Sequence, residues 1–215
     1  MQIKVFYFNE LRVCTYLLWD DTLECVIVDC GCENEHECAR LQKFIANHNL
    51  KPVMLLSTHG HFDHNMSNAF ITKTYNIKSY IHVGDKAYLA QTAEIAKGFG
   101  YNNVENPPAP DGYLEDGQII RFGQSQLQVL HTPGHSKGSV CFYAEESNFV
   151  LTGDLLFQGC IGRTDLPGGD YDEIIDSLLN KIVPLPDKTV VYSGHGPATT
   201  VGEEKRANPF IVEKM

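Results

Sequence analysis

The stretch Thr58-His59-Gly60-His61-Phe62-Asp63-His64 follows a short apolar run at residues 53–56. Four of its residues are potential metal ligands: His59, His61, Asp63 and His64. Alternate residues of an extended segment project to the same side, so the first three can converge while the last begins a second group. A single histidine here would more often have a packing role. Three histidines and a carboxylate at the end of a buried strand indicate a metal site.

This cluster is too small to complete two coordination shells, because each metal needs several ligands and an open position for water. Three later segments can supply the rest, and in each a glycine stands beside the candidate ligand: Pro133-Gly134-His135, Gly153-Asp154 and Gly194-His195-Gly196. Each segment follows an apolar run, and glycine allows the backbone to approach a crowded site closely. His131 is near enough in sequence to compete with His135 as a ligand.

In these segments the chain resembles the metallo-β-lactamase superfamily, and in particular its small glyoxalase II-like (hydroxyacylglutathione hydrolase-like) hydrolases. The resemblance covers residues 5–209 and is most specific at Gly153-Asp154-Leu155-Leu156-Phe157 and at Gly162-Arg163-Thr164-Asp165-Leu166-Pro167-Gly168-Gly169-Asp170. It implies an α/β fold, the αββα sandwich. Two mixed β-sheets are then expected face to face, with helices on both outer faces and a dinuclear site at one edge.

The resemblance also implies how the ligands divide. One metal would be held by His59, His61 and His135, the other by Asp63, His64 and His195, with Asp154 bridging them. The Pro-Gly-His motif of the family favours His135 over His131. Five imidazoles and two carboxylates suit borderline divalent ions, with zinc expected first and iron or manganese as alternatives. Superfamily members commonly support the metal loop from the position of Asp29, although an aspartate that caps a turn is an equal alternative.

Such a site predicts hydrolysis. Two divalent ions would act on a bridging water, and a zinc-bound water has a pKa of about 7, so hydroxide is available at neutral pH. Asp63 and Asp154 are the expected catalytic carboxylates. The chain offers no G-x-S-x-G elbow for a protein nucleophile. A thioester suits this site because its thiolate needs little protonation, so the expected activity resembles hydrolysis of S-lactoylglutathione.

Three alternatives remain open at this point. Persulfide dioxygenases with a single iron resemble the chain around Gly162-Arg163-Thr164-Asp165, although the complete second ligand set disfavours them. A non-catalytic metal-binding or electron-transfer scaffold is the second alternative, and a flavodiiron type would need a carboxylate where His61 stands. The third is a lactonase or β-lactamase, because a metal cluster by itself does not select the acyl group.

Candidate substrate-binding residues are Arg163, Lys137 and Tyr101. Arg163 follows Asp154 by nine residues and could bind a substrate carboxylate through two parallel hydrogen bonds. A salt bridge to Asp165 is the alternative of equal weight. Residues 98–112 are rich in Gly, Asn and Pro, which is typical of a surface connection, and such a long loop can also be a lid over a pocket.

The overall composition places the chain among ordinary globular proteins. A length of 215 residues favours one domain, 1–215, without the helical C-terminal segment that full-length glyoxalase II uses to bind glutathione. Glutathione as the thiol carrier is therefore in doubt. The net charge of −10 disfavours nucleic acid as a partner, since Lys and Arg form no basic stripe. A small molecule is the expected partner, and the oligomeric state is left open.

Apolar runs and cysteines indicate the compartment. We find neither a signal peptide nor a stretch as long as a membrane span, so a cytoplasmic location without membrane attachment is expected. The seven cysteines are then expected to be reduced thiols. Cys30, Cys32, His36 and Cys38 suggest a zinc knuckle, but the spacing lacks paired C-x-x-C halves, which favours free thiols.

Apolar periodicity and turn residues predict the local structure. Strands are expected at residues 3–8, 13–18, 24–29, 53–56, 80–83, 118–122, 126–131, 139–143, 148–151 and 189–192, with 53–56 buried on both faces. Helices are expected behind Asn34, near residues 66–71, behind Asp85 as a cap, and behind Asp170. The expected buried stripes are Tyr88, Leu89, Thr92, Ile95 and Ala96 in the third helix and Tyr171, Ile174, Leu178 and Ile182 in the fourth.

Overall fold

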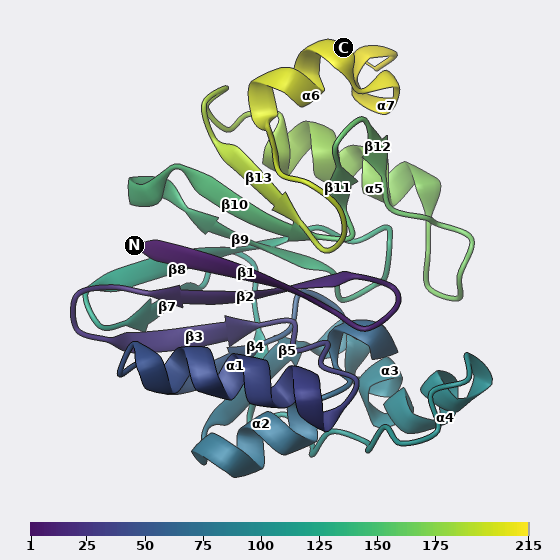
Figure 1. Cartoon of the computed structure of the whole chain (residues 1–215). Helices are drawn as coiled ribbons and strands as arrows, with labels where there is room; N and C mark the ends of the chain where they lie inside the picture. Colours follow the sequence, from purple (N-terminus) through teal and green to yellow (C-terminus); the bar gives the residue numbers. More distant parts are fainter. Residues whose placement is uncertain (215) are drawn as a thin grey trace.

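The computed structural model describes residues 1–214 and contains two six-stranded sheets that lie face to face (Figure 1). The strands of the first sheet stand side by side in chain order. They are β1 (Gln2–Phe8), β2 (Val13–Trp19), β3 (Glu24–Val28), β4 (Lys51–Leu56), β5 (Lys78–His82) and β6 (Gly112–Leu114). The first three strands pair antiparallel, whereas β3 to β6 pair parallel. The carboxyl ends of β3, β4 and β5 therefore meet at one edge.

The second sheet has the order β14-β13-β10-β9-β8-β7. Its strands are β7 (Ile119–Phe122), β8 (Ser125–His131), β9 (Val140–Ala144), β10 (Phe149–Gly153), β13 (Val190–Ser193) and β14 (Thr199–Thr200). Strands β10 and β13 are parallel, and the other pairs are antiparallel, so β8, β10 and β13 run in one direction. A separate two-stranded ribbon joins β11 (Leu156–Phe157) to β12 (Cys160–Ile161). Both large sheets are mixed.

Helices cover the outer faces of both sheets (Figure 1). Helices α1 (Glu35–Asn47) and α2 (Asn68–Tyr75) lie on the first sheet, and α5 (Tyr171–Ser177) and α6 (Val201–Ala207) lie on the second. The remaining α-helices are α3 (Lys86–Ala90), α4 (Thr92–Gly98) and α7 (Pro209–Val212). The predicted αββα sandwich is therefore confirmed. None of the helices within residues 1–214 has both the length and the apolar character needed to cross a membrane.

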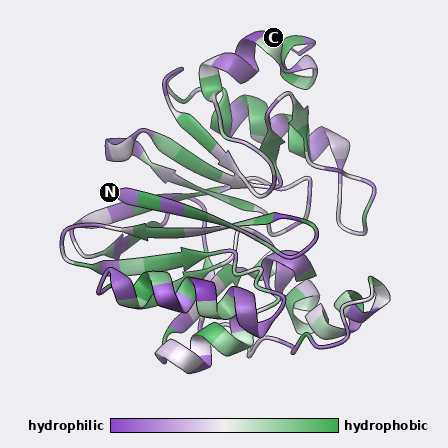
Figure 2. Ribbon diagram, in the orientation of Figure 1, coloured by the Kyte–Doolittle hydropathy of each residue, from purple (hydrophilic) through white to green (hydrophobic). Residues whose placement is uncertain are grey.

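Strand β2 shows how the sequence builds these layers. All seven of its residues are buried, because it has apolar neighbours on both faces. Cys14, Tyr16 and Leu18 pack between the two sheets, while Leu17 and Trp19 pack against α1. Figure 2 shows mostly apolar residues in the strands and both hydrophobic and hydrophilic residues in the helices, as expected for helices that bury one face.

The two predicted helix starts behind Asn34 and Asp170 are confirmed. The Asn34 side chain accepts a hydrogen bond from the Glu37 amide at 3.1 Å, and Asp170 accepts from the Glu173 amide at 3.0 Å. Neither glutamate completes a reciprocal capping box. Glu37 instead accepts hydrogen bonds from the amides of Asn9 and Glu33. The bond from Asn9 connects α1 to the β1–β2 turn.

Three local predictions were wrong. Strand β4 is fully buried only at Leu55 and Leu56, whereas Val53 and Met54 are half-buried. The helix expected near residues 66–71 begins only at Asn68, after a 3₁₀ turn at Phe62–His64, so Met66 lies outside it. The predicted stripe from Tyr88 to Ala96 is divided between α3 and α4, and Tyr171 is exposed.

All seven cysteines are free thiols, and only Cys160 is exposed. Within residues 1–214, the groups of side chains close enough to share one ion contain no cysteine.

Candidate metal centre

The loops that follow six strands meet at one edge of the sandwich. In the first sheet these loops follow β3, β4 and β5, and in the second they follow β8, β10 and β13. Main-chain hydrogen bonds join the two sheets here. The Cys14 amide donates to the Gly194 carbonyl at 2.7 Å, and the Val140 amide donates to the Thr58 carbonyl at 2.8 Å. The loops that carry the predicted ligands are thus held against one another by backbone contacts.

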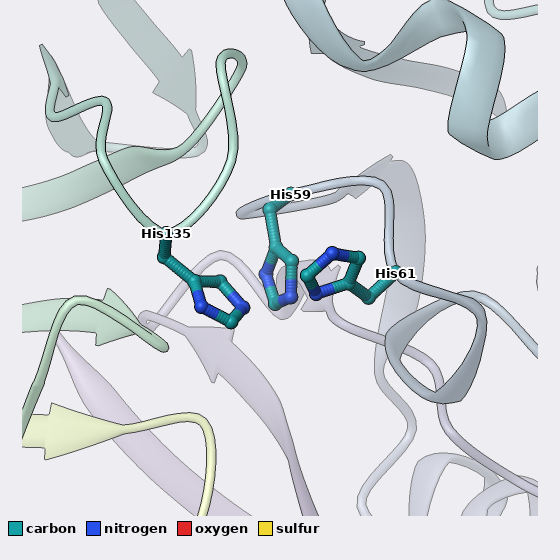
Figure 3. A group of neighbouring side chains, drawn as sticks. All are labelled: His59, His61 and His135. Atoms are coloured by element: carbon teal, nitrogen blue, oxygen red, sulfur yellow. The ribbon is translucent and has the colours of Figure 1, made fainter. Parts of the chain in front are cut away.

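The first group of side chains is His59, His61 and His135, which point toward one another (Figure 3). One nitrogen from each ring lies within 4.8 Å of the other two. The Nε2 atoms of all three are buried and find no hydrogen-bond partner among residues 1–214. Buried polar atoms without a partner cost free energy, so a cation between these lone pairs would satisfy them. The three rings therefore fit a bound metal ion.

The second group is Asp63, His64 and His195, whose ligand atoms also lie within 4.8 Å of one another. Asp154 lies between the two groups. Its Oδ1 is 3.4 Å from Nε2 of His64, and its Oδ2 is 3.6 Å from Nε2 of both His135 and His195. The structure thus brings together all seven side chains that the sequence predicted as ligands, and a third, overlapping group of His59, His64 and Asp154 joins the first two.

The outward-facing nitrogens of the histidines are held by the surrounding protein. Nδ1 of His64 lies 2.9 Å from Oδ2 of Asp29, Nδ1 of His135 lies 2.8 Å from the Arg163 carbonyl oxygen, and Nδ1 of His195 lies 2.9 Å from the Leu11 carbonyl oxygen. An oxygen acceptor at Nδ1 keeps a proton there, so Nε2 is the nitrogen that is left for a metal ion. This is the tautomer that a metal ligand requires.

Asp29 supports the His-rich loop rather than capping a turn. Its carboxylate accepts hydrogen bonds from the Thr58 amide at 2.7 Å and the Thr58 hydroxyl at 2.6 Å, in addition to its contact with His64. The residue is buried and has a φ of 56°, which directs the chain out of β3 toward the site.

Asp85 is a positioning residue that the sequence prediction missed. It makes no side-chain capping bond to α3 and is completely buried. Its carboxylate instead accepts from the Gly60 amide at 2.7 Å, the Gly138 amide at 2.8 Å and the Ser136 hydroxyl at 2.6 Å. These bonds connect the loop of His59 to the loop of His135. The sequence carries no signal for them, because residues 60, 85 and 136–138 meet only in the folded chain.

Burial and mutual charge set the ionisation of the site. Burial, reinforced by neighbouring histidines, lowers the pKa of His59 well below its usual value and that of His61 to about 4. Burial also acts to lower the pKa of His64, but the carboxylates of Asp154, Asp63 and Asp29 outweigh it and raise that pKa. His59 and His61 are therefore neutral at neutral pH, with lone pairs available to a cation.

The two carboxylates in the site remain ionised. Burial acts to raise the pKa of Asp63 and of Asp154, but the charges and hydrogen bonds of the neighbouring histidines, His64 above all, together outweigh it and lower both pKa values. Burial acts to lower the pKa of His195, but the hydrogen bond to Asp63 and the negative charges of Asp154 and Asp63 together outweigh it and raise that pKa. Two carboxylates next to five imidazoles make a donor set suited to borderline divalent ions.

A family model for the Metallo-beta-lactamase superfamily matches residues 9–195, which include every candidate ligand. The chain belongs to the metallo-beta-lactamase superfamily. Membership confirms the resemblance that the motifs predicted, and with the clustered ligands it supports divalent metal ions as the cofactor.

Three individual proteins show how this superfamily member relates to others. It is 35% identical over 215 residues to hydroxyacylglutathione hydrolase GloC of Haemophilus influenzae, with all of both chains covered. The structure of BLEG-1 B3 metallo-beta-lactamase is 34% identical with a TM-score of 0.90, covering 98% of this chain and 99% of that one. The structure of TTHA1623 in a di-iron-bound form is 37% identical with a TM-score of 0.86, covering 96% and 99%. These three proteins have different names although their sequence identities to this chain are similar. The comparisons therefore do not specify the substrate of this chain.

A cavity of about 550 Å³ opens above the metal-ligand groups of this metallo-beta-lactamase superfamily member. Its floor is formed by side chains of the candidate metal centre: His61, Asp63, His135, Asp154 and His195. Its walls are largely apolar and come from four separate parts of the chain: Leu11, Phe62, Tyr88, Ile95, Phe99, Leu166 and Pro167. A concave site of this size, with polar groups converging at its base, has the usual form of a small-molecule site.

The three predicted substrate-binding residues lie in different surroundings. Arg163 lines the cavity, but it also makes two parallel hydrogen bonds to Asp165, at 2.7 and 2.8 Å. Lys137 is 3.0 Å from Glu173 and does not line the cavity. Tyr101 packs beside Phe62 with ring centroids 5.8 Å apart, behind the wall. Within residues 98–112, only Phe99 lines the cavity, so a role of this loop as a lid stays a prediction.

Tyr88 is a wall residue that the sequence prediction assigned to the core. Its ring packs edge-on against His61 with centroids 5.3 Å apart, and its hydroxyl donates to the Pro167 carbonyl. This bond ties α3 to the segment after β12 across one side of the cavity. Helical periodicity indicated an inward face but could not show that this face borders a cavity rather than a packed core.

Proposed function

We propose that this chain is a dinuclear metal-dependent hydrolase of thioesters. The observation that carries the proposal is the pair of ligand groups that share Asp154 at the base of an apolar cavity. We assign one ion to His59, His61 and His135 and the other to Asp63, His64 and His195. The free thiols fit a reducing compartment, so we place the enzyme in the cytoplasm.

Zinc is the proposed metal, and iron is the main alternative because the similar TTHA1623 structure is di-iron-bound. Divalent ions at this site would supply Lewis acidity, lowering the pKa of a water and polarising the carbonyl of the substrate.

The side chains at the base of the cavity organise the reaction. We assign Asp63 and Asp154 to orient the attacking water, because both carboxylates reach the cavity and their lowered pKa values keep them ionised as hydrogen-bond acceptors. The water oxygen forms a bond to the carbonyl carbon, and the C–S bond breaks with its electron pair going to sulfur. The products are a carboxylate and a thiol, and the second water proton is released to solvent.

A thioester fits better than an amide because, among the described residues that line the cavity and are not assigned as metal ligands, none is free to protonate a basic leaving group. The Tyr88 hydroxyl, which borders the cavity, is already committed to the Pro167 carbonyl. Arg163 remains charged, and at neutral pH it cannot act as an acid. A thiolate leaves without prior protonation, so this arrangement suffices for it.

The test is metal analysis combined with an activity screen of the purified protein. We expect two divalent ions per chain and hydrolysis of acyl thioesters that stops on chelation and returns when metal is added. The screen includes S-lactoylglutathione, a lactone, a β-lactam and a persulfide. One iron per chain together with oxygen consumption on the persulfide would instead identify a dioxygenase and overturn the proposal.

A further inference from the structure

The walls of the cavity are suited to an uncharged substrate. Seven of its thirteen lining residues are apolar or aromatic, and the polar ones are, apart from Arg163, the side chains of the metal centre. Two of the wall residues, Leu11 and Phe99, are 43% and 64% exposed. Large apolar side chains grouped at the mouth of a cavity are stabilised when a ligand covers them. The part of the substrate remote from the reacting carbonyl is therefore expected to be apolar.

The described residues that form the cavity walls offer no free positive charge to an anionic thiol carrier. Among the described residues that line it, Arg163 is the only lysine or arginine, and its guanidinium is already bound side-on by Asp165. The nearby Lys137 is paired with Glu173. A glutathione thioester carries two carboxylates and one ammonium group, so it would have to displace Asp165 and would still face that free carboxylate. The net charge of −10 adds a long-range repulsion.

We infer that the substrate is a thioester of an apolar acyl group on an uncharged thiol, bound against Phe62, Ile95 and Phe99 on one side and Leu166 and Pro167 on the other. This inference rests on the proposed thioester hydrolysis and specifies its substrate class. Apolar contact selects such a substrate because each buried methylene contributes about 0.8 kcal/mol, which is about a fourfold gain in kcat/KM.

The first experiment measures kcat/KM for the metal-loaded protein with two carriers and a series of acyl groups. N-acetylcysteamine is an uncharged carrier and glutathione is an anionic one, and each carries acetyl, butanoyl, hexanoyl and phenylacetyl groups. We expect kcat/KM to rise about fourfold per methylene until the cavity is filled, and the uncharged carrier to be used at least as well as glutathione at every acyl length.

Two variants test the walls and the ion pair. Phe99→Ala is expected to lower kcat/KM for the hexanoyl and phenylacetyl thioesters about tenfold, a larger loss than for the acetyl thioester. Tyr171→Ala is the matched control, an exposed aromatic residue on α5 that does not line the cavity. Asp165→Asn releases Arg163, so we expect it to raise kcat/KM for the glutathione thioesters about threefold or more without helping the uncharged series.

The outcomes separate this inference from the proposed function. If the wild-type protein hydrolyses glutathione thioesters more than tenfold better than their uncharged counterparts, or shows no dependence on acyl length, the inference is wrong and thioester hydrolysis stands. If no thioester of either series is hydrolysed with two metal ions bound, the proposed function itself is wrong.

Discussion

Oδ2 of Asp29 lies 2.9 Å from Nδ1 of His64, with both side chains buried. The same carboxylate holds the amide and hydroxyl of Thr58, so one residue at the end of β3 fixes both ends of the His-rich loop. The contact also keeps Nε2 of His64 turned toward Asp154 and His195. Metal affinity should therefore depend on a residue that does not itself reach the site.

Replacing this carboxylate should weaken metal binding. We expect Asp29→Asn to reduce the affinity about 10- to 100-fold, because the amide removes the charge that stabilises the donor tautomer of His64. Competition with a chromogenic chelator measures the affinity, and circular dichroism checks the fold. The exposed Asp21→Asn is the control. Equal affinity in Asp29→Asn and wild type would contradict the role of Asp29.

Each ligand group should lose its own ion. We expect His59→Ala and His195→Ala each to reduce the metal content from two ions per chain to one, since each removes one of three ligands from a different group. Elemental analysis after gel filtration gives the stoichiometry. The double variant is expected to bind none. Two retained ions in either single variant would contradict the proposed division of ligands.

Asp85→Asn should loosen the connection between the loops of His59 and His135. An amide can replace at most part of the three hydrogen bonds that Asp85 accepts, and a buried donor left without a partner costs about 1–3 kcal/mol. We expect a loss of about 2 kcal/mol in the free energy of unfolding, measured by urea denaturation. The exposed Asp172→Asn should change it by less than about 0.5 kcal/mol.

Metal removal should lower the thermal stability. Ions that bind only the folded chain stabilise it by about 2.7 kcal/mol each at 100 times their dissociation constant. Chelation should therefore lower Tm by several degrees, and re-added zinc should restore it. Differential scanning calorimetry measures the change. The His59→Ala His195→Ala double variant should show no such shift, and an equal shift in that protein would point to binding elsewhere.

Asp20 should make the fold sensitive to acid. Partial burial acts to raise its pKa, but hydrogen bonds from Thr22, Ser125 and Gln124 outweigh this and lower it to about 2. The usual aspartate pKa is about 3.9, so the unfolded chain binds the proton more readily than the folded one. The stabilisation is complete above about pH 4 and is lost as the pH falls toward 2.

Urea titrations at several pH values measure this effect. We expect the difference in midpoint between wild type and Asp20→Asn to be constant from pH 5 to 7 and to shrink from pH 4 to 2. A difference that does not change with pH would show that the hydrogen bonds of Asp20 do not depend on its charge.

Much of the candidate site could be predicted from local sequence. The ligand types, their alternation in His59-Gly60-His61 and the glycines beside His135 and His195 are all short-range features. Most strands were also predictable, because their burial follows the periodicity of the chain. Gly194 is a further example of a glycine beside a candidate ligand. A Cβ atom at this position would collide with Asp154.

Only the tertiary structure decided which other residues serve the site. From the sequence, Asp85 is predicted to cap a helix and Tyr88 to lie in the core. In the folded chain, residues 60 and 136–138 lie beside Asp85, and residue 167 lies beside Tyr88. The Leu11 carbonyl oxygen lies beside Nδ1 of His195, although the two residues are far apart in the sequence. Periodicity and spacing constrain neighbours along the sequence, whereas these contacts arise where two sheets and their loops pack together. The sequence by itself therefore determined the chemistry of the metal centre, and tertiary packing decided its support and the apolar cavity above it.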